Sequence, residues 1–280
     1  MIHTGEHAST PGGLSVSVVA YWPDPQQLAR TLATLAQAIA ELRSEAPMPV
    51  AVYLVDNGGL PDVSGSVANL ERQGATCAVI AGQGNVGYGR GHNLAIDRAA
   101  GAFHLVLNPD IDLDPKALTE ALAFFGAHPD AGLLAPLIGD DHDGIQYLCR
   151  RYPTVFDLFA RGFLPARLRG LFARRLARYE MRDLINERDV VWDPPIISGC
   201  FMIFRTAVLK RLNGFDERYF LYFEDYDLSL RAHELARVVY VPAVHVQHHG
   251  GGAARKGYAH IRMFSASAFK FFGRFGWKWL

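Results

Sequence analysis

The sequence predicts an α/β fold in which a mostly parallel sheet carries helices on both faces. Through residues 14–127, short β-type runs alternate with stretches of helical periodicity, and the connections between them are short. The run 50–55 is apolar throughout, which is typical of a parallel strand buried on both faces. With 280 residues, 50% of them hydrophobic and 20% charged, the chain is long enough for one large α/β domain with additions.

The first half of the chain contains successive strand–helix units. Between Gln26 and Arg43, apolar residues recur at helical spacing; Pro25 can open this helix and Pro47 ends it. Strands are expected at 14–20, 50–55, 77–81 and 103–107, and helices at 26–43, 64–73, from the glycine-rich loop to 100, and at 115–127. In the second half we expect strands at 132–138, up to Arg205 and at 238–241, and a short helix at 206–212.

Polar or glycine-rich segments follow three of the predicted strands. These segments are Asp56, the loop 82–93 and Asp110. In parallel sheets ligands bind beyond the carboxyl ends of the strands, so the three should meet at one edge. Taken singly, Asp56-Asn57-Gly58 and Asn108-Pro109-Asp110 are also good turn sequences. Their shared position at strand ends favours a ligand site.

The loop 82–93 contains the pattern G-x-G-x-x-G, which also occurs in dinucleotide-binding proteins. That fingerprint belongs after the first strand, whereas here it follows the third. We therefore favour a loop whose backbone approaches a nucleotide-sugar instead. The loop also carries polar side chains that could reach phosphate or sugar, namely Asn85, Arg90 and Asn93.

An acidic cluster at Glu224, Asp225 and Asp227 lies among aromatic and aliphatic residues. Because unpaired carboxylates are costly to bury, the cluster predicts a metal, a basic partner or a catalytic role. Alternatively, it is simply the start of a helix, where acidic side chains complement the dipole. From these residues alone, the two interpretations stand equal.

Two adjacent histidines, His248 and His249, precede the glycine run 250–252. One of them could complete a metal site with Asp110, although a lone histidine is usually structural. We interpret residues 141–143 as a solvated tip and the three cysteines as reduced and buried.

The segment 150–190 is rich in arginine, and residues 257–280 mix aromatic and basic side chains. A basic amphipathic helix from Pro165 onward would suit an anionic membrane surface; a solvated basic face is an equal alternative. For 257–280, the alternative is a helix packed on the domain. The formal net charge of zero argues against nucleic acid.

Together these motifs resemble glycosyltransferase family 2, of GT-A fold, in its rhamnosyltransferase-like branch of bacterial polysaccharide biosynthesis. The matching segments occur in family order over roughly residues 16–252. They are Val18-Val19-Ala20-Tyr21, Val55-Asp56-Asn57, the loop 84–93, Leu107-Asn108-Pro109-Asp110, Ser198-Gly199-Cys200-Phe201-Met202, Gly214-Phe215-Asp216-Glu217 and Phe223-Glu224-Asp225-Tyr226-Asp227.

The resemblance implies an inverting transfer of a sugar from a nucleotide-sugar to an acceptor hydroxyl. Asp225 would be the general base, and Asp110 with His248 would bind Mg²⁺ or Mn²⁺, His249 being a close second. The donor would be held by Asp56, Asn85, Gly87, Arg90, Asn93, Asn108 and Asp110, with Gly199, Glu224 and Asp227 supporting the site or the acceptor. Two departures are that Asn-Pro-Asp replaces a D-x-D motif, and that Arg255 and Lys256 follow the glycines where relatives have Ser or Thr.

The resemblance further implies a glycan or lipid-linked acceptor and a cytoplasmic enzyme in peripheral contact with the inner membrane. The best donor is dTDP-L-rhamnose; UDP-galactofuranose and a UDP-N-acetylhexosamine are alternatives. An NAD-dependent oxidoreductase and a catalytically silent scaffold are rivals of other classes. We divide the chain into a flexible tail (1–13), the GT-A domain (14–256) and a C-terminal helix (257–280).

Overall fold

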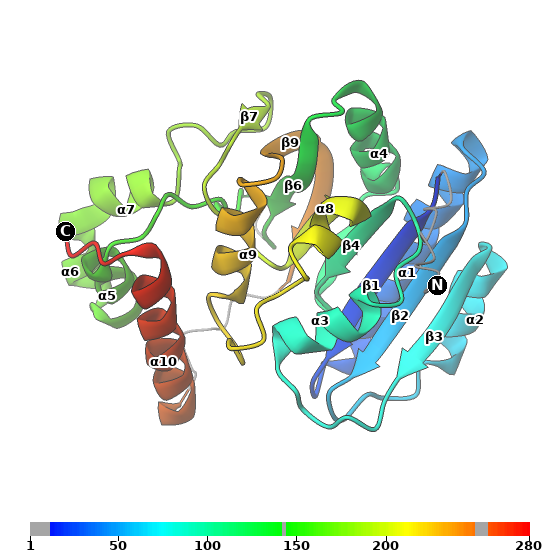
Figure 1. Cartoon of the computed structure of the whole chain (residues 1–280), viewed down its shortest axis with the longest axis horizontal. Helices are drawn as coiled ribbons and strands as arrows, with labels where there is room; N and C mark the ends of the chain where they lie inside the picture. Colours follow the sequence, from blue (N-terminus) through cyan, green and yellow to red (C-terminus); the bar gives the residue numbers. More distant parts are fainter. Residues whose placement is uncertain (1–11, 142–143, 250–256) are drawn as a thin grey trace, which may run out of the picture.

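The computed structural model describes residues 12–141, 144–249 and 257–280. Its centre is a nine-stranded sheet in the order β3-β2-β1-β4-β8-β6-β9-β5, with β7 also paired to β9 (Figure 1). The strands are β1 (Leu14–Ala20), β2 (Val50–Asp56), β3 (Ala75–Ile80), β4 (Phe103–Leu107), β5 (Ile111–Leu113), β6 (Ala131–Gly139), β7 (Val191–Trp192), β8 (Phe201–Arg205) and β9 (Arg237–His248).

The sheet is parallel in its first half and mixed in its second. Strands β3, β2, β1 and β4 are parallel neighbours, as predicted. Strand β8 is antiparallel to both β4 and β6, β6 is parallel to β9, and β5 and β7 are antiparallel to β9. The mostly parallel sheet is thus confirmed only for its first half. The reason is that β8 enters beside the carboxyl end of β4, where Asn108 N donates to the Cys200 carbonyl at 2.9 Å.

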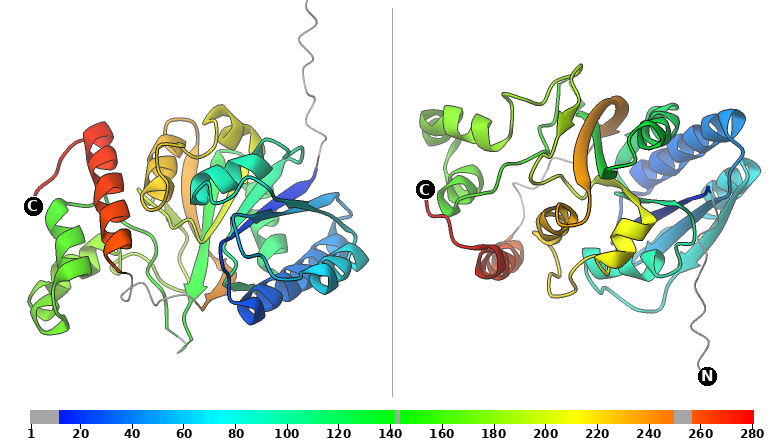
Figure 2. Two further views of the ribbon diagram at one scale, coloured as in Figure 1. Left: turned by 90° about the horizontal axis from the view of Figure 1, so that it is seen from below. Right: turned by 45° about the horizontal axis from the view of Figure 1, so that its top comes forward.

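Helices cover both faces of the sheet, as the α/β prediction requires (Figure 2). One face carries α1 (Pro25–Glu45), α2 (Ser64–Arg72) and α4 (Ala117–Ala127), and the other carries α3 (Tyr88–Ile96), α8 (Thr206–Arg211) and α9 (Glu224–Ala232). Asp24 caps α1 by accepting from the amides of Gln26 and Gln27, and buried aliphatic side chains of α1 pack on the sheet.

Two strands differ from the sequence-based expectation. Strand β5 lies in a segment expected to be a turn and a helix lead-in; pairing of Ile111 with His248 makes it a strand. Strand β9 continues through His248, whereas only 238–241 was predicted. Both are explained by pairing between distant segments, which local sequence patterns do not report.

A lobe of helices lies beside the β9 side of the sheet (Figure 1). It contains α5 (Val155–Phe163), α6 (Ala166–Arg169), the 3-10 turn η1 (Gly170–Phe172), α7 (Ala173–Tyr179) and α10 (Tyr258–Phe275). The basic segment predicted to be helical from Pro165 onward is helical, but the 3-10 turn η1 divides it into α6 and α7. Tertiary contacts break it, because Phe172 packs on Phe156 at a centroid distance of 4.8 Å and Arg175 pairs with Asp157 at 2.6 Å.

Helix α10 lies within the predicted C-terminal segment and buries Ser267, Phe271 and Phe272. None of the helices among the described residues is both long and apolar enough to cross a bilayer. Of the predicted tail, residues 1–11 lie outside the described residues.

Candidate active site

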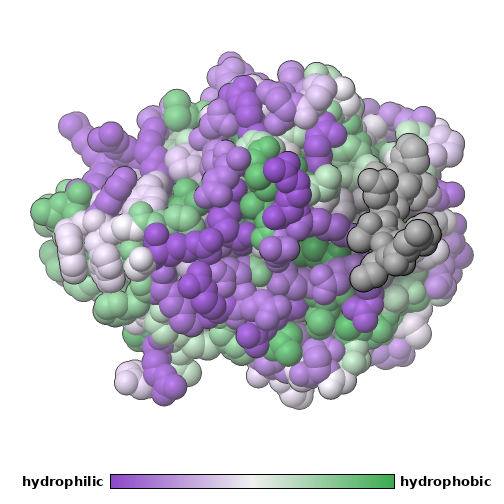
Figure 3. Space-filling model, viewed as in Figure 1, coloured by the Kyte–Doolittle hydropathy of each residue, from purple (hydrophilic) through white to green (hydrophobic). Residues whose placement is uncertain are grey.

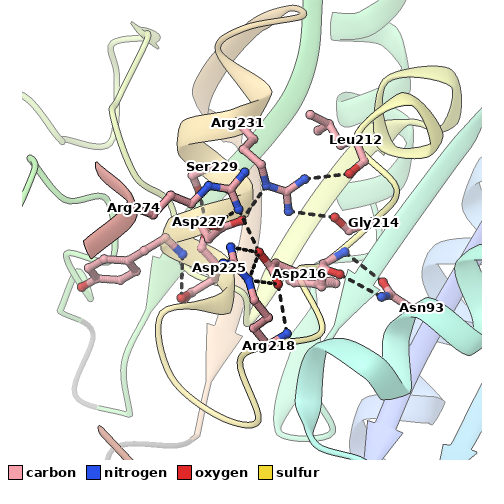
Figure 4. A network of polar contacts seen from close by, with 12 residues as sticks. Asn93, Leu212, Gly214, Asp216, Arg218, Asp225, Asp227, Ser229, Arg231 and Arg274 are labelled. Atoms are coloured by element: carbon pink, nitrogen blue, oxygen red, sulfur yellow. Dashed lines mark hydrogen bonds and ion pairs between the residues drawn. The ribbon is translucent and has the colours of Figure 1, made fainter. Parts of the chain in front are cut away.

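Asp225 lies in the first turn of α9, and two backbone amides fix its carboxylate. Gly199 N donates to Oδ2 at 3.0 Å, and Tyr226 N donates to Oδ1 at 2.9 Å. Gly199 belongs to the turn before β8, and a Cβ there would lie only 3.2 Å from the Cβ of Asp225. One turn along α9, Ser229 donates to the Asp225 carbonyl at 2.7 Å (Figure 4). The carboxylate is therefore oriented from a segment 26 residues away as well as from its own helix.

Glu224 and Asp225 are neighbouring carboxyl groups with different surroundings. Burial and the Asp225 charge raise the pKa of Glu224 to about 8, and Glu224 Oε2 is buried with no hydrogen-bond partner among the described residues. Burial also raises the pKa of Asp225, while the amides of Gly199 and Tyr226 act in the opposite direction. Because such donors favour the charged form, Asp225 is the more readily ionised member of the pair.

The two residues before Glu224 adopt left-handed backbone conformations, which are unusual for aromatic side chains. The φ angles are 71° at Tyr222 and 68° at Phe223, and each such residue costs about 1–3 kcal/mol. Phe223 packs against Phe264 and Phe271 of α10 at centroid distances of 5.1 and 5.2 Å. Helix α10 therefore stabilises the strained segment that leads to the acidic cluster.

Asp227 is fully buried and is neutralised by two arginines (Figure 4). Arg231 Nε lies 2.5 Å from Oδ1, and an Arg274 guanidinium nitrogen lies 2.9 Å from Oδ2. Arg274 also contacts Asp216 at 2.8 Å. Asp227 thus ties α9 to α10 and to the loop after α8, and it has no exposed surface with which to meet a substrate.

Asp110 and His248 face each other at the carboxyl edge of the sheet, with 3.5 Å between Asp110 Oδ2 and His248 Nε2. Gln146 fixes the imidazole tautomer. Its Nε2 donates to the His248 carbonyl at 2.9 Å, so its Oε1 accepts from His248 Nδ1–H at 2.7 Å. The other ring nitrogen, Nε2, faces Asp110, whose Oδ1 is buried without a hydrogen-bond partner among the described residues.

These two side chains fit a divalent cation. A carboxylate oxygen and an imidazole nitrogen that face each other are the donors that Mn²⁺ accepts, and the second imidazole nitrogen is anchored as in metal sites generally. Within residues 12–141, 144–249 and 257–280 no three His, Cys, Asp or Glu side chains come together to hold a metal by themselves. Any cation here would need further ligands from phosphate or water.

His249 has different partners from His248. Its Nε2 lies 2.8 Å from Asp112 Oδ2, and its Nδ1 lies 2.5 Å from Asp141 Oδ1. Burial lowers the pKa of His249, but the hydrogen bonds to Asp112 and Asp141 outweigh this effect and raise it. With both nitrogens directed at carboxylates, His249 is the poorer metal ligand. Asp141, expected to be simply solvated, is part of this contact.

The glycine-rich loop is tied to the end of β2. Gln83 Nε2 donates to the Asp56 carbonyl at 2.7 Å, and Asn57 Nδ2 donates to the Gly87 carbonyl at 2.9 Å. Gly87 has a φ of 92°, and a Cβ there would lie 2.4 Å from the Phe220 carbonyl oxygen. Glycine is therefore required for this loop to reach the segment before α9.

Asp56 and Asn85 both stabilise turns with their side chains. Asp56 Oδ1 accepts from Gly58 N at 2.8 Å, and Asn85 Oδ1 accepts from Gly87 N at 3.1 Å. The Asp56 contact is the turn that the sequence analysis gave as the alternative to a ligand site, whereas no turn was predicted for Asn85. The two contacts also place both residues on the loops that border the site.

Arg90 and Asn93 differ in their accessibility. Arg90 is exposed and faces Glu217 at 3.4 Å. Asn93 is engaged at both ends of its amide: Nδ2 donates to the Phe215 carbonyl and Oδ1 accepts from Phe215 N, each at 2.9 Å. Asn93 was expected to contact the donor, but in the structure it holds the Gly214–Phe215 turn (Figure 4).

Sequence analysis missed two residues of this site, Tyr88 and Gln146. The Tyr88 hydroxyl lies 2.6 Å from the Gly199 carbonyl oxygen and 3.0 Å from Asn108 Oδ1. Its place within the glycine-rich motif was a usable signal. Gln146 follows no local motif, and only tertiary pairing brings it to His248.

Several residues singled out in the sequence lie outside the described residues, and they are His142, Asp143, the glycines 250–252, Arg255 and Lys256. The contacts given above join the remaining predicted residues. These come from β2, the glycine-rich loop, β4, the turn before β8 and α9.

Residues 11–262 match the family model described as "Glycosyltransferase like family 2". The chain is 31% identical over 251 residues to the N-acetylglucosaminyl-diphospho-decaprenol L-rhamnosyltransferase of Mycobacterium tuberculosis, covering 84% of this chain and 76% of that protein. It is 28% identical over 176 residues to rhamnosyltransferase WbbL of Escherichia coli, covering 59% of this chain and 62% of that protein.

Solved structures support the fold. TarS of S. aureus (residues 1–349) superposes with a TM-score of 0.54 at 18% identity over 93% of this chain and 72% of that one. The mannosyltransferase PcManGT of Pyrobaculum calidifontis, in complex with GDP-Man and Mn²⁺, gives 0.56 at 16% identity over 91% and 61%. None of these comparisons supports the oxidoreductase alternative. From the extent of the family match and the identity to the mycobacterial relative, this chain belongs to glycosyltransferase family 2.

Proposed function

We propose that this glycosyltransferase inverts the anomeric centre as it moves a sugar from a nucleotide-sugar to a hydroxyl of a lipid-linked glycan. The observation that carries the proposal is the Asp225 carboxylate, held by two backbone amides beside Glu224, whose Oε2 is buried without a partner among the described residues. The relatives named above include an L-rhamnosyltransferase with a diphospho-decaprenol acceptor. L-Rhamnose from dTDP-L-rhamnose is therefore the first donor to test, with UDP-galactofuranose and UDP-N-acetylhexosamines as alternatives.

Asp225 acts as the general base. It accepts the proton of the acceptor hydroxyl while that oxygen attacks the anomeric carbon from the face opposite the nucleotide, and the nucleoside diphosphate leaves. The raised pKa of Asp225 strengthens it as a base, and the raised pKa of Glu224 disfavours a second negative charge beside it. Gly199 orients the Asp225 carboxylate, and Asp227 anchors the helix that carries it.

The donor binds along the carboxyl edge of the sheet. Asn85 and Arg90 lie in the glycine-rich loop there, Asp56 lies beside it at the end of β2, and Gly87 lets the loop approach α9. Asp110 and His248 would hold Mg²⁺ or Mn²⁺. The bound ion would neutralise the charge of the leaving diphosphate.

A donor panel tests this proposal directly. The purified chain is incubated with each nucleotide-sugar, Mn²⁺ and lipid-linked acceptor extract, and release of nucleoside diphosphate is measured. We expect release from one donor, and release from none would favour the silent scaffold. Stabilisation by NAD(H) in thermal-shift assays, with none by nucleoside diphosphate and Mn²⁺, would contradict the proposal.

The base is tested by Asp225→Asn. The amide keeps the shape of the side chain but cannot accept the acceptor proton, so turnover should fall about 100- to 10,000-fold. Asp130→Asn, at the opposite edge of the sheet, should behave like the parent. An Asp225→Asn variant with full activity would refute the assigned base.

We also propose peripheral contact with the cytoplasmic face of an anionic membrane through the lobe. Large apolar side chains are exposed there among arginines and lysines, and Figure 3 shows hydrophobic surface at the edge of the molecule that carries the lobe. These exposed side chains are Phe159, Phe163, Leu168, Leu171, Phe269, Trp277 and Trp279. Such mixtures suit the bilayer interface, where a lipid-linked acceptor would be found.

A further inference from the structure

The Tyr88 hydroxyl lies between the two halves of the active site. Tyr88 lies within the glycine-rich loop 82–93 and is the first residue of α3. Its oxygen is 2.6 Å from the Gly199 carbonyl and 3.0 Å from Asn108 Oδ1. One hydroxyl hydrogen thus faces two acceptors, one in the turn before β8 and the other at the end of β4.

The Gly199 contact leads to the base. Gly199 accepts from Tyr88 with its carbonyl and donates to Asp225 Oδ2 with its amide at 3.0 Å. Both contacts act on one small residue, in which a Cβ would lie 3.4 Å from the Tyr88 oxygen and 3.2 Å from the Asp225 Cβ. A shift of the Gly199 backbone would therefore displace the Asp225 carboxylate.

The Asn108 contact leads to the metal-binding pair. Asn108 directly follows β4 and lies two residues before Asp110, and its Oδ1 is 3.0 Å from the Tyr88 hydroxyl. Asn108 thus has Tyr88 on one side and Asp110 on the other. Through Asn108 the hydroxyl therefore holds the strand-end segment that carries Asp110.

The rest of Tyr88 is firmly held. Its amide donates to the Phe220 carbonyl at 3.0 Å, and its ring packs edge-on against His92 and Phe215 at centroid distances of 4.5 and 5.9 Å. The hydroxyl is therefore presented from a fixed ring, as a positioning group requires.

We propose that Tyr88 is a positioning residue that sets the distance between the base and the donor's diphosphate. Its hydroxyl orients Asp225 through Gly199 and Asp110 through Asn108, so both ends of the reacting donor–acceptor pair are placed by one group. The inference rests on the proposed transfer reaction, in which Asp225 and Asp110 act on opposite sides of the anomeric carbon.

Tyr88→Phe tests this inference because it keeps the ring contacts and removes only the hydroxyl. With the donor selected by the panel, kcat should fall at least about tenfold while the donor KM changes less than about threefold, because misplacement of reacting groups lowers turnover more than binding. Mn²⁺ titration of the chain alone, followed by electron paramagnetic resonance, should show a Kd raised about threefold or more.

Tyr240→Phe is the matched control. The Tyr240 hydroxyl also donates to a backbone carbonyl, that of Asn186 at 2.7 Å. The Tyr240→Phe variant should have a lower melting temperature than the parent, with unchanged kcat and Mn²⁺ affinity. If Tyr88→Phe matches the parent in both kcat and Mn²⁺ Kd, the inference is wrong.

A failure of the proposed function would give a different experimental result from a failure of this inference. If the parent releases no nucleoside diphosphate from any donor, that function fails, and the Mn²⁺ titrations then decide the Asp110 half of the inference alone. A Tyr88→Phe variant with parental Mn²⁺ affinity would overturn that half, and a weakened affinity would support it.

Discussion

At the scale of single residues, hydrogen bonding distinguishes side chains that look equivalent in the sequence. Glu224, Asp225 and Asp227 form one acidic cluster, yet Asp227 is bound by two arginines and Asp225 by two amides, while Glu224 Oε2 has no partner among the described residues. Three environments result: a carboxylate paired with arginines, a carboxylate held by backbone amides, and a buried carboxyl group with an unpaired oxygen.

Gln146 offers a prediction at this scale. Because it anchors His248 Nδ1, Gln146→Ala should raise the Kd for Mn²⁺ about tenfold or more, as loss of such partners does in metal sites. Isothermal titration calorimetry with Mn²⁺ would measure this. Gln146→Glu, which still accepts from Nδ1–H, should restore most of the affinity.

The control is Gln37→Ala, since Gln37 is an exposed residue of α1. Parental Mn²⁺ affinity in Gln146→Ala would contradict the anchoring role. Loss of affinity in Gln37→Ala as well would point to a general effect on the protein.

At the scale of elements, α10 supports the loop that presents the acidic cluster. Ser267 donates to the Leu221 carbonyl at 2.8 Å, and Arg274 bridges Asp216 and Asp227. The sequence had left open whether the C-terminal segment packs on the domain or meets a membrane. One side of α10 packs, while Phe269 on the same helix is 66% exposed.

Arg274→Met should therefore destabilise the fold and lower activity together. Removing one partner of a buried ion pair costs about 3–5 kcal/mol; because Arg274 itself is 35% exposed and Arg231 still neutralises Asp227, we expect about 1–2 kcal/mol. Urea denaturation measures this loss. Arg262→Met, at an exposed position of α10, should leave stability unchanged, and equal losses in both variants would argue against the bridge.

The lobe gives a second prediction at this scale. Sedimentation with vesicles of phosphatidylglycerol and phosphatidylcholine should retain the parent at low salt, with weaker retention at high salt or on neutral vesicles. A Trp277→Ser, Trp279→Ser double variant should bind several-fold less. Binding that is unaffected by both vesicle charge and the two tryptophans would contradict the proposed surface.

At the scale of the whole molecule, a buried polar chain crosses the interface between the sheet and α3. His104 bonds to Ser15 at 2.7 Å and to Ser17 at 2.9 Å, and Ser17 bonds to His92 at 2.7 Å. Burial, with the nearby Lys210 charge, lowers the pKa of His104 to about 3. Burial also lowers the pKa of His92 well below its usual value.

The buried histidines of this polar chain predict that the protein loses stability in acid. A histidine whose pKa is depressed by folding stabilises the native state fully above about pH 6.5 and progressively less as the pH falls toward its folded pKa. Between pH 7 and 5, His104 should account for a loss of about 2 kcal/mol. In urea denaturation, His104→Gln should therefore lose less stability than the parent over this range.

His128→Gln is the control, because His128 is only partly buried. It should follow the parental pH dependence. An equal loss of stability for the parent and His104→Gln between pH 7 and 5 would show that the buried chain does not govern acid sensitivity.

The sequence by itself determined the α/β class, the first four parallel strands and the strand-end positions of Asp56 and Asp110, because these depend on hydrophobic periodicity and turn chemistry within short windows. Only the tertiary structure decided the antiparallel entry of β8, the break-up of the basic helix and the partners of each carboxylate. Those features depend on contacts between segments tens to hundreds of residues apart, such as Asp225 with Gly199, His248 with Gln146 and Tyr88 with Asn108. Local patterns do not contain that information, and so the chemistry of the acidic cluster becomes specific only in the folded chain.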